Sequence, residues 1–450
     1  MEAVAVFDAV TIGGGPAGST AARLLAQWGY SVAIVTAAPA KGPSFAECLP
    51  PSTGKLFTFL GIQEAIDRAG FFRTTGNTVW WGKSRRRVEF YPEGAGYQVL
   101  RSEYDALLLD LAVRAGATVH TGKAVGSFAE GRPRVLVDSA SHLQAKFFLD
   151  CSGRAGVLGR FLRVRQPKSR TAAICAAWTS EAGWKLPDPT HTLVESYDGG
   201  WAWSVPLSPI LRHVAVMVSP GKGAVYLKEL EKTRAFRRII SRAKLASAPW
   251  GRASYQYTSR QFGGPGFLLV GDAGSVIDPL SSFGVKKAMV SGWIAAVVVN
   301  TCLRRPAMQE AALRFYEERE GKIYEDWREA SASWLRRGGI EAFADDESPA
   351  AAPAEAVHAA WEALRRQDSI RLRRGTGSLA AEAAIQGNEI VIGDAMLGGV
   401  NLVRLCEIAG RHSQVPDLFE AYNRLGPPVA LPSFLTALST LVARGVLTSL

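Results

Sequence analysis

The first forty positions show the pattern of apolar and small residues expected for a strand, a tight turn, a helix and a second strand. Residues 10–12 end a buried apolar strand, and residues 16–28 form a helical segment with a face of small residues. Residues 30–35, with the sequence YSVAIV, form the next apolar stretch. Apolar strands that alternate with helices are typical of a parallel sheet with helices packed on it. The pattern therefore predicts an α/β domain that begins with a βαβ unit.

Three longer segments further along the chain also show helical or strand periodicity. Residues 101–119 predict an amphipathic helix that leads into a strand. Residues 266–299 contain a buried strand, a polar turn and a helix that begins at Gly284. Residues 306–335 predict a long charged helix with a narrow apolar face. The α/β pattern thus continues to about residue 340.

A strand with two indole side chains stands out at residues 199–207, which read GGWAWSVPL. Successive side chains of a strand point to opposite faces, so Trp201 and Trp203 share one face. Two interpretations remain open at about equal weight. The two rings form either a packed wall of a sheet or a surface that contacts an aromatic substrate.

The carboxyl-terminal part has a different pattern. Residues 341–356 are rich in Ala, Pro and acidic residues, which predicts a linker. A helix is expected at 356–367, a hairpin at 388–399, and three helices that end in a strand at 401–450. This order is similar to that of winged-helix domains, including those that hold peptides by adding a strand to a sheet edge. A domain that simply packs on the catalytic region is an equal alternative.

Composition narrows the class of protein without selecting one activity. A chain of 450 residues is too long for one core, so two or three domains are expected. The net charge of +11 favours acidic partners, cofactor phosphates included. Five scattered cysteines without a CxxC pair, and six histidines without ligand spacing, argue against a disulfide framework and a metal site. Without a secretory signal or a membrane-spanning segment, the sequence predicts a cytoplasmic protein.

The turn of the first βαβ unit carries the chemistry of a dinucleotide site. Gly13-x-Gly15-x-x-Gly18 allows a tight turn and a close backbone approach to a pyrophosphate, which then lies at the helix N-terminus. The second strand of such units ordinarily ends in Asp or Glu, which holds a ribose. Here Thr36 has that place, so either its hydroxyl or a nearby backbone group holds the ribose, or dinucleotide affinity is low.

Later segments resemble the FAD site of flavoprotein aromatic hydroxylases and flavin-dependent halogenases. The motifs are Arg101 before a helix, residues 148–156 (FLDCSGRAG), and residues 266–299 with Gly271-Asp272, Asp278-Pro279 and a helix that starts at Gly284. They occur in family order. The resemblance implies bound FAD, with these cofactor-binding residues: Gly13, Gly15, Pro16, Ala17, Gly18, Thr36, Glu47, Arg101, Gly271, Asp272, Pro279, Gly284 and Val285.

The same resemblance implies the fold class. It is α/β, with a Rossmann-like FAD-binding domain of the aromatic hydroxylase (GR2) type, an inserted and mainly antiparallel substrate sheet, and a carboxyl-terminal winged-helix-like α+β domain. The expected boundaries are a catalytic region at 1–340, a linker at 341–356 and the last domain at 357–450. Within the catalytic region, the FAD-binding parts are about 1–75, 100–165 and 255–340, and the substrate sheet is about 76–99 and 166–254.

One residue type separates two branches of this superfamily. Halogenases need a lysine between the flavin and substrate compartments, in the neighbourhood that follows residues 60–62. The nearest counterpart by position is Arg73, which has no lone pair and cannot form a haloamine. Lys83 follows the end of a strand and is expected to point elsewhere. Halogenation of an aromatic substrate is therefore the alternative at this point.

The segment ECLPPSTGKLFTFLG followed by GNTVWWG resembles flavoprotein monooxygenases that hydroxylate tryptophan during biogenesis of cysteine tryptophylquinone in quinohemoprotein amine dehydrogenases. The residues that carry this resemblance are Glu47, Pro50, Pro51, Gly76, Asn77, Trp80 and Gly82. It implies hydroxylation of an indole through a flavin C4a-hydroperoxide, on a partner peptide or protein. Arg73 and Asn77 are candidate catalytic orienters, and the expected pocket residues are Trp80, Trp81, Trp201, Trp203 and Pro206.

Other activities and partners remain open. A flavoenzyme similar to geranylgeranyl reductases and a non-catalytic flavoprotein chaperone are further alternatives. No second GxGxxG is visible, so NAD(P)H reduces the flavin directly or a separate flavin reductase does. The expected partners are a tryptophan-bearing peptide or protein, held by the carboxyl-terminal domain, and a reductase. Few basic residues occur in 401–450, which argues against nucleic acid.

Overall fold

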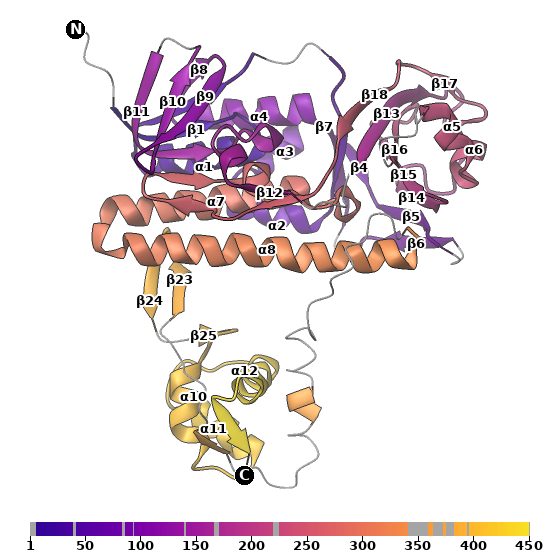
Figure 1. Ribbon diagram of the computed structural model, residues 1–450. Helices are drawn as coiled ribbons and strands as arrows, with labels where there is room; N and C mark the ends of the chain where they lie inside the picture. The colour runs from indigo at the N-terminus through magenta and orange to yellow at the C-terminus, as the bar shows by residue number, and fades with distance from the viewer. Residues whose placement is uncertain are drawn as a thin grey trace. The chain divides into compact units, whose positions relative to one another are not determined.

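The structure is a computed structural model, and the chain divides into two compact units (Figure 1). The first unit is Met1–Arg304 with Tyr316–Asp346, and the second is Arg305–Phe315 with Glu347–Leu450. The start of the long helix groups with the second unit, and the expected domain boundaries at 340 and 356 stay predictions. The structure describes these residues: 6–38, 42–82, 86–92, 94–138, 141–165, 171–218, 225–340, 359–362, 372–374, 382–393 and 396–449.

A parallel sheet forms the centre of the dinucleotide-binding part. Its order is β21-β11-β1-β2-β8, and β20 pairs with β21 antiparallel at one edge. Ile12 of β1 lies opposite Val35 of β2 and Asp150 of β11, so the carboxyl ends of these strands meet at one edge. Ligands of open α/β sheets bind at this edge. The strands are β1 Val6–Ile12, β2 Val32–Thr36, β8 Thr118–Thr121, β9 Ala124–Ala129, β10 Arg132–Val137, β11 Ser141–Asp150, β20 Gly263–Gly264 and β21 Phe267–Leu269.

Helices α1 (Pro16–Gln27), α4 (Arg101–Arg114) and α7 (Gly284–Arg304) pack in this part of the unit (Figure 1). The small-residue face of α1 lets α7 approach closely. A Cβ atom at Gly292 of α7 would lie 2.5 Å from the carbonyl oxygen of Ala17. The predicted βαβ unit is therefore present. The close packing of α7 on α1 holds the start of α1, and with it the glycine turn that precedes this helix.

The second sheet of this unit has the order β17-β13-β16-β15-β14-β5-β6, with β18 also paired to β13. All of its pairs are antiparallel except that of β14 with β5. It lies beside the parallel sheet in Figure 1. The strands are β5 Gly76–Trp80, β6 Arg87–Phe90, β13 Ala172–Thr179, β14 Thr192–Tyr197, β15 Gly200–Pro206, β16 Leu211–Val218, β17 Lys244–Leu245 and β18 Trp250–Ala253.

Short elements complete the first unit. A three-stranded sheet has the order β3-β7-β4, and β12 pairs with β19. The elements are β3 Ala46–Leu49, β4 Phe72–Thr74, β7 Gly96–Leu100, β12 Arg163–Arg165, β19 Tyr257–Ser259, α2 Ser52–Phe59, α3 Gln63–Arg68, α5 Tyr226–Glu231 and α6 Ala235–Ile240.

The long helix α8 (Gln309–Arg337) ties the two sheets together through its part in the first unit. The hydroxyl of Tyr316 donates to the carbonyl oxygen of Leu269 in β21 at 2.9 Å. In its last turn, the carbonyl oxygen of Trp334 in α8 accepts from the indole N–H of Trp81 at 2.8 Å. The charged helix predicted at 306–335 is thus a brace between the dinucleotide and substrate parts.

His213 of β16 is a buried histidine whose titration should affect stability. Its side chain packs edge-to-face on Trp250, and burial lowers the pKa of His213 to about 4, from 6.5 for a free histidine. The unfolded chain therefore takes up a proton first as the pH falls. The contribution of His213 to stability is complete above about pH 6.5 and is lost toward about pH 4, by at most about 3 kcal/mol.

A His213→Phe variant is expected to remove this dependence while it keeps a ring against Trp250. Denaturant unfolding of both proteins from pH 7.5 to 4.5 measures the difference. The wild-type protein should lose stability relative to the variant as the pH falls through this range. A difference between the two proteins that does not vary with pH would show that His213 is not a buried neutral group.

The second unit contains the predicted three helices that end in a strand. They are α10 Leu402–Ala409, α11 Val415–Arg424, α12 Leu431–Ala443 and β27 Leu447–Ser449. Their core includes Leu405, Leu418, Phe434 and Leu438, all at the expected helical spacing. The winged-helix assignment itself stays a prediction.

The hairpin predicted at 388–399 is wrong in its bounds. Two antiparallel pairs occupy this region, β23 (Glu382–Gln386) with β24 (Glu389–Gly393), and β25 (Met396–Leu397) with β26 (Val400–Asn401). Strand β22 (Leu372–Arg374) pairs with β27. Of the helix expected at 356–367, only 359–362 are described, and these are helical. The linker at 341–356 lies outside the described residues. No described helix is long and apolar enough to cross a membrane.

Candidate active site

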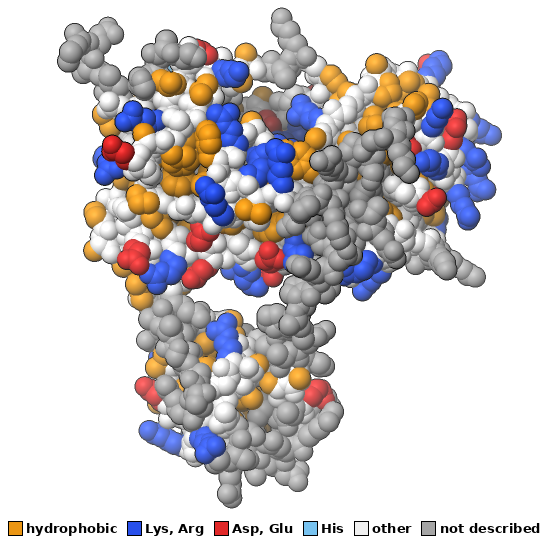
Figure 2. Space-filling view, viewed as in Figure 1, with side chains coloured by type: hydrophobic (Ala, Val, Ile, Leu, Met, Phe, Trp, Pro, Cys, Tyr) orange, Lys and Arg blue, Asp and Glu red, His pale blue; other side chains and the backbone are white. Residues whose placement is uncertain are grey.

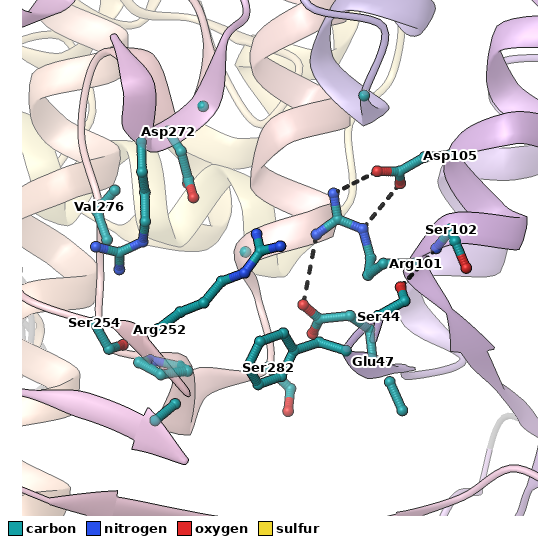
Figure 3. Close-up of a pocket in the computed structure, with 18 of the residues that line it drawn as sticks. Ser44, Glu47, Arg101, Ser102, Asp105, Arg252, Ser254, Asp272, Val276 and Ser282 are labelled. Carbon is teal, nitrogen blue, oxygen red and sulfur yellow. Dashed lines mark hydrogen bonds and ion pairs between the residues drawn. The ribbon is translucent and has the colours of Figure 1, made fainter. Parts of the chain in front are cut away.

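A cavity of about 900 Å³ opens at the carboxyl edge of the parallel sheet and extends to the indole-bearing strand β15. A second cavity of about 560 Å³ adjoins it and shares several lining residues, among them Gly15, Arg101 and Asp272. Figure 3 shows polar side chains that point into the larger cavity from several elements. One continuous space therefore joins the predicted dinucleotide end to the predicted aromatic end.

The glycine turn is shaped as a dinucleotide cradle. Gly13 has a φ of +112°, and a Cβ atom there would lie 2.4 Å from the carbonyl oxygen of Cys151. A Cβ atom at Gly18 would lie 1.9 Å from the carbonyl oxygen of Gly13. Gly15 caps helix α1 without any side-chain hydrogen bond, and no acidic residue lies in the first turn. The amide of Gly13 donates to the carbonyl oxygen of Val35 at 2.7 Å, and the uncapped start of α1 leaves amide groups available for an anion.

Three charged residues follow the cradle along the cavity wall. Arg101 donates to both carboxylate oxygens of Asp105 at 2.9 Å, and its guanidinium lies 3.6 Å from Glu47 (Figure 3). Burial raises the pKa of Glu47, although the charge of Arg101 acts in the opposite direction. Thr36 ends β2 and lines both cavities, where a ribose-binding acid would ordinarily be found.

The Gly271–Asp272 turn presents Asp272 to both cavities. The ammonium group of Lys287 donates to the carbonyl oxygens of Gly271 and Ser275, at 3.2 and 2.5 Å. The hydroxyl of Ser291 accepts from the amide of Gly271 at 2.9 Å, and that of Tyr257 donates to the carbonyl oxygen of Asp272 at 2.6 Å. These buried side chains hold the turn that presents Asp272. The sequence does not distinguish Lys287 from the neighbouring Lys286, so it gave no signal for this role.

Asp278 and Pro279 begin the next part of the wall. The carboxylate of Asp278 accepts from the amide of Leu280 at 2.9 Å, and burial raises the pKa of Asp278 to about 6. Pro279 and Gly284 both line the larger cavity, and helix α7 begins at Gly284. Val285 lines the adjoining cavity. Every cofactor-binding residue predicted from the sequence lines one of the cavities except Gly18 and Gly271, which shape the turns just described.

Asp150, in the segment FLDCSGRAG, lines neither cavity. Its carboxylate accepts from the amides of Ser152, Leu158 and Gly159, at 3.1, 2.6 and 2.8 Å, and its side chain is fully buried. It therefore orders the loop after β11. Ser152 and Gly153 of that loop line both cavities.

The far end of the cavity is an aromatic chamber on one face of the second sheet. Trp201 and Trp203 have ring centroids 4.7 Å apart and both line it, together with Val194, Val205 and Ala173. Trp81 packs against Trp201 with ring centroids 6.4 Å apart, and it does not line the cavity. Trp80 packs with the core on another side of the sheet, and Pro206 ends β15 away from the lining.

The two candidate catalytic orienters lie outside the cavity lining. Arg73 stacks on the ring of Tyr97 at 4.0 Å and donates to the carbonyl oxygen of Ala95 at 2.9 Å. The side-chain oxygen of Asn77 accepts from the hydroxyl of Tyr91 at 3.1 Å. The structure therefore gives both residues partners within the sheet edges. Neither side chain is brought to the flavin or chamber residues.

Several lining residues were not foreseen from the sequence. Phe45, Arg154, Arg252 and Ser254 line the larger cavity beside the chamber. The face of the first unit seen in Figure 2 shows several Lys and Arg side chains. Within the described residues, no group of three or more His, Cys, Asp or Glu side chains could hold a metal ion.

This arrangement is that of an FAD-dependent oxidoreductase. A glycine cradle and helix N-terminus fit the pyrophosphate, Asp272 fits the sugar-alcohol chain, and the start of α7 fits the ring end. A Cβ atom at Gly15 would meet only a side-chain oxygen of Asp105 at 3.8 Å, so the cradle is open toward the cavity. The residues present therefore fit FAD.

Comparison with known proteins gives the family. The sequence model of the tryptophan halogenase family matches residues 83–332, which is more than half of the 450 residues, and the chain belongs to this family. A tryptophan 2-halogenase of Chondromyces crocatus is 32% identical over 333 residues, which cover 68% of this chain and 64% of that protein. The chain thus spans somewhat less than two thirds of that relative.

Solved structures show the same fold. The crystal structure of CmlS, a flavin-dependent halogenase, has a TM-score of 0.81 and 21% identity, and the match covers 99% of this chain and 96% of that one. The peptidyl tryptophan dihydroxylase QhpG has a TM-score of 0.70 and 20% identity, with coverage of 98% and 100%. The predicted FAD cofactor and α/β flavoprotein fold are confirmed. The sequence analysis predicted a closer relation to tryptophan hydroxylases, and the structural similarity to QhpG supports only a shared fold.

Proposed function

We propose that the protein halogenates an electron-rich aromatic ring with FAD as cofactor. The observation that carries this proposal is the continuity of the cavity from the glycine cradle to the chamber of Trp201 and Trp203. Membership of the tryptophan halogenase family supports it. The sequence alone favoured hydroxylation and kept halogenation as the alternative, and we now reverse that order.

When it is bound and reduced, FAD supplies the electrons that let dioxygen oxidise a halide. The overall balance is an aromatic C–H, chloride, dioxygen, reduced FAD and one proton, which give the aryl chloride, two waters and oxidised FAD. The residues of this chain have three tasks. The cradle and Asp272 fix the cofactor, the start of α7 directs N–H groups toward its ring end, and the chamber excludes water around the substrate.

Hydroxylation of an indole is the second candidate, and one observation favours it. No lysine lines the larger cavity among the described residues, and Lys123 lines only the adjoining space at the dinucleotide end. Arginines line the chamber instead, and a guanidinium has no lone pair with which to carry a halogen. In this case the substrate is a tryptophan of a partner peptide, and the second unit would hold that peptide.

The source of electrons is part of the proposal. We infer that a separate flavin reductase supplies reduced FAD. The described residues contain no second glycine-rich dinucleotide turn after a strand, so a nicotinamide has no dedicated site in them. A reductase from any source should therefore support turnover.

A double-isotope reaction distinguishes the two candidate functions. Purified protein, FAD, NADH and a flavin reductase are incubated with ³⁷Cl-labelled chloride and ¹⁸O₂ in the presence of a panel of indoles, phenols and pyrroles. Mass spectrometry then identifies the atom that is added. We expect a product with ³⁷Cl and no ¹⁸O, and its loss when chloride is omitted. A product that carries ¹⁸O and no chlorine would contradict halogenation and establish the second candidate.

A further inference from the structure

The arginines that line the larger cavity differ in whether they already have an ion-pair or hydrogen-bond partner. Arg101 lies between two carboxylates, those of Glu47 and Asp105. Arg154 donates to the carbonyl oxygen of Tyr255 at 3.0 Å. Arg252 makes no hydrogen bond or ion pair with any described residue, and its recorded contact is with the ring of Phe45, at 5.8 Å from the centroid. Arg252 is therefore an available cation in the cavity that the indoles of Trp201 and Trp203 also line.

The pairing of strands places Arg252 on the sheet that forms the wall of the chamber. Trp201 of β15 lies opposite Met217 of β16, Met217 opposite Ala173 of β13, and Ala173 opposite Arg252 of β18. Side chains of such a cross-strand row project on the same face of a sheet. Arg252 thus extends from the face that carries the indoles. Figure 3 shows its guanidinium in the open middle of the cavity, with no dashed line to any residue drawn.

We propose that Arg252 binds a carboxylate on the aromatic substrate, so that the enzyme selects aromatic acids. This inference rests on the proposed function, because it concerns the substrate of the same site. A guanidinium presents a planar fork of N–H donors that matches a carboxylate in two parallel hydrogen bonds. Binding the acid group here would orient the ring beside Trp201 and Trp203.

The cofactor is a weaker candidate for the partner of Arg252. The helix N-terminus of α1 and the neighbouring Arg101, both on the dinucleotide side of the cavity, would hold the pyrophosphate. Arg252 is absent from the adjoining cavity that those groups line, and its strand belongs to the other sheet. Arg252 is therefore better placed to bind an anionic group of the substrate than the phosphates of the cofactor.

Equilibrium binding to the FAD-loaded protein tests this proposal without turnover. Isothermal titration calorimetry compares matched acids and amides, indole-3-acetate with indole-3-acetamide and 4-hydroxyphenylacetate with its amide. In the wild-type protein, at least one acid should bind about tenfold or more tightly than its amide. Arg252→Gln should remove that difference, and Arg252→Lys should restore part of it. The Kd of FAD, measured by fluorescence, should stay within twofold.

Arg165→Gln is the matched control. It removes the same charge from β12, where Arg165 lies on the ring of Tyr255 at 5.4 Å outside the cavity lining, and it should keep the preference for acids. The proposal is wrong if no acid binds better than its amide, if Arg165→Gln has the same effect as Arg252→Gln, or if Arg252→Gln weakens FAD instead. An oxygenated product in the isotope reaction would contradict the proposed halogenation. It would not affect the binding measurements that test Arg252.

Discussion

Replacement of Gly18 with alanine is expected to abolish FAD binding and to destabilise the first unit. The added Cβ atom would lie 1.9 Å from the carbonyl oxygen of Gly13, so the turn between β1 and α1 must move. Overpacking against rigid backbone costs about 1–3 kcal/mol of the free energy of unfolding. The movement also displaces the amides that face the pyrophosphate. We expect the Kd of FAD to rise at least about 100-fold, which is close to 3 kcal/mol.

Gly15→Ala separates the two effects of a methyl group in this turn. Gly15 has a φ of −79°, which any residue adopts, and its Cβ would meet only a side-chain oxygen at 3.8 Å. Stability should therefore be unchanged, while FAD affinity falls about tenfold because the methyl group occupies the approach to the pyrophosphate. Fluorescence titration and urea unfolding measure the two quantities. Wild-type FAD affinity in Gly18→Ala would refute the placement of the pyrophosphate.

Replacement of Arg212 with methionine is expected to cost about 3 kcal/mol or more of the free energy of unfolding. The guanidinium is fully buried and donates to Ser204, to the carbonyl oxygen of Pro189 and to that of His191, at 2.8, 2.8 and 2.5 Å. Burial lowers the pKa of Arg212 to about 9, so it remains charged at neutral pH. Its removal leaves two buried acceptors, at Ser204 and His191, and the partly buried carbonyl oxygen of Pro189 without donors, at about 1 kcal/mol or more for each buried group.

The same change should disturb the chamber, because Thr192 follows His191 and lines the cavity. Arg212→Lys keeps the charge and part of the donor set, so we expect an intermediate loss of stability. Urea unfolding of the three proteins gives the order wild type, lysine, methionine. A methionine variant within about 1 kcal/mol of the wild type would mean that the three acceptors find other donors.

The dinucleotide end could be predicted because its determinants are local. Gly13, Gly15 and Gly18 act within one turn, and the neighbouring strand and helix are apparent in the apolar pattern. Alternation along β15 was also sufficient to place Trp201 and Trp203 on one face, and the structure shows that this face lines the cavity. In both cases the information lies within a few consecutive residues.

Arg73 and Arg252 show where the sequence is insufficient. Arg73 follows the expected neighbourhood in sequence, but β4 pairs with β7, and this places it over Tyr97 at the sheet edge. Arg252 looks like an ordinary surface cation in the sequence. Only the pairing of β18 with β13, about eighty residues earlier in the chain, brings it to the chamber. Side-chain direction set by such long-range pairing is not encoded in local periodicity.

Lys287 and Tyr257 were missed for a related reason. Both act on backbone carbonyl groups of the Gly271–Ser275 turn, through side chains that are fully buried. A motif names the residues that touch a cofactor, whereas the groups that hold the motif come from distant elements. Their positions depend on how α7 and β19 pack, which composition and spacing do not reveal.

The most direct test of the account is a crystal structure of the protein with FAD bound. The account predicts a pyrophosphate at the amides of the Gly13–Gly18 turn, and an isoalloxazine ring beside Pro279 and Gly284 whose edge faces the chamber of Trp201 and Trp203. Arg252 should then lie free between ring and chamber, with its guanidinium toward the substrate space. A flavin ring bound away from α7, or a wall of side chains that closes the chamber off from the ring, would contradict the account.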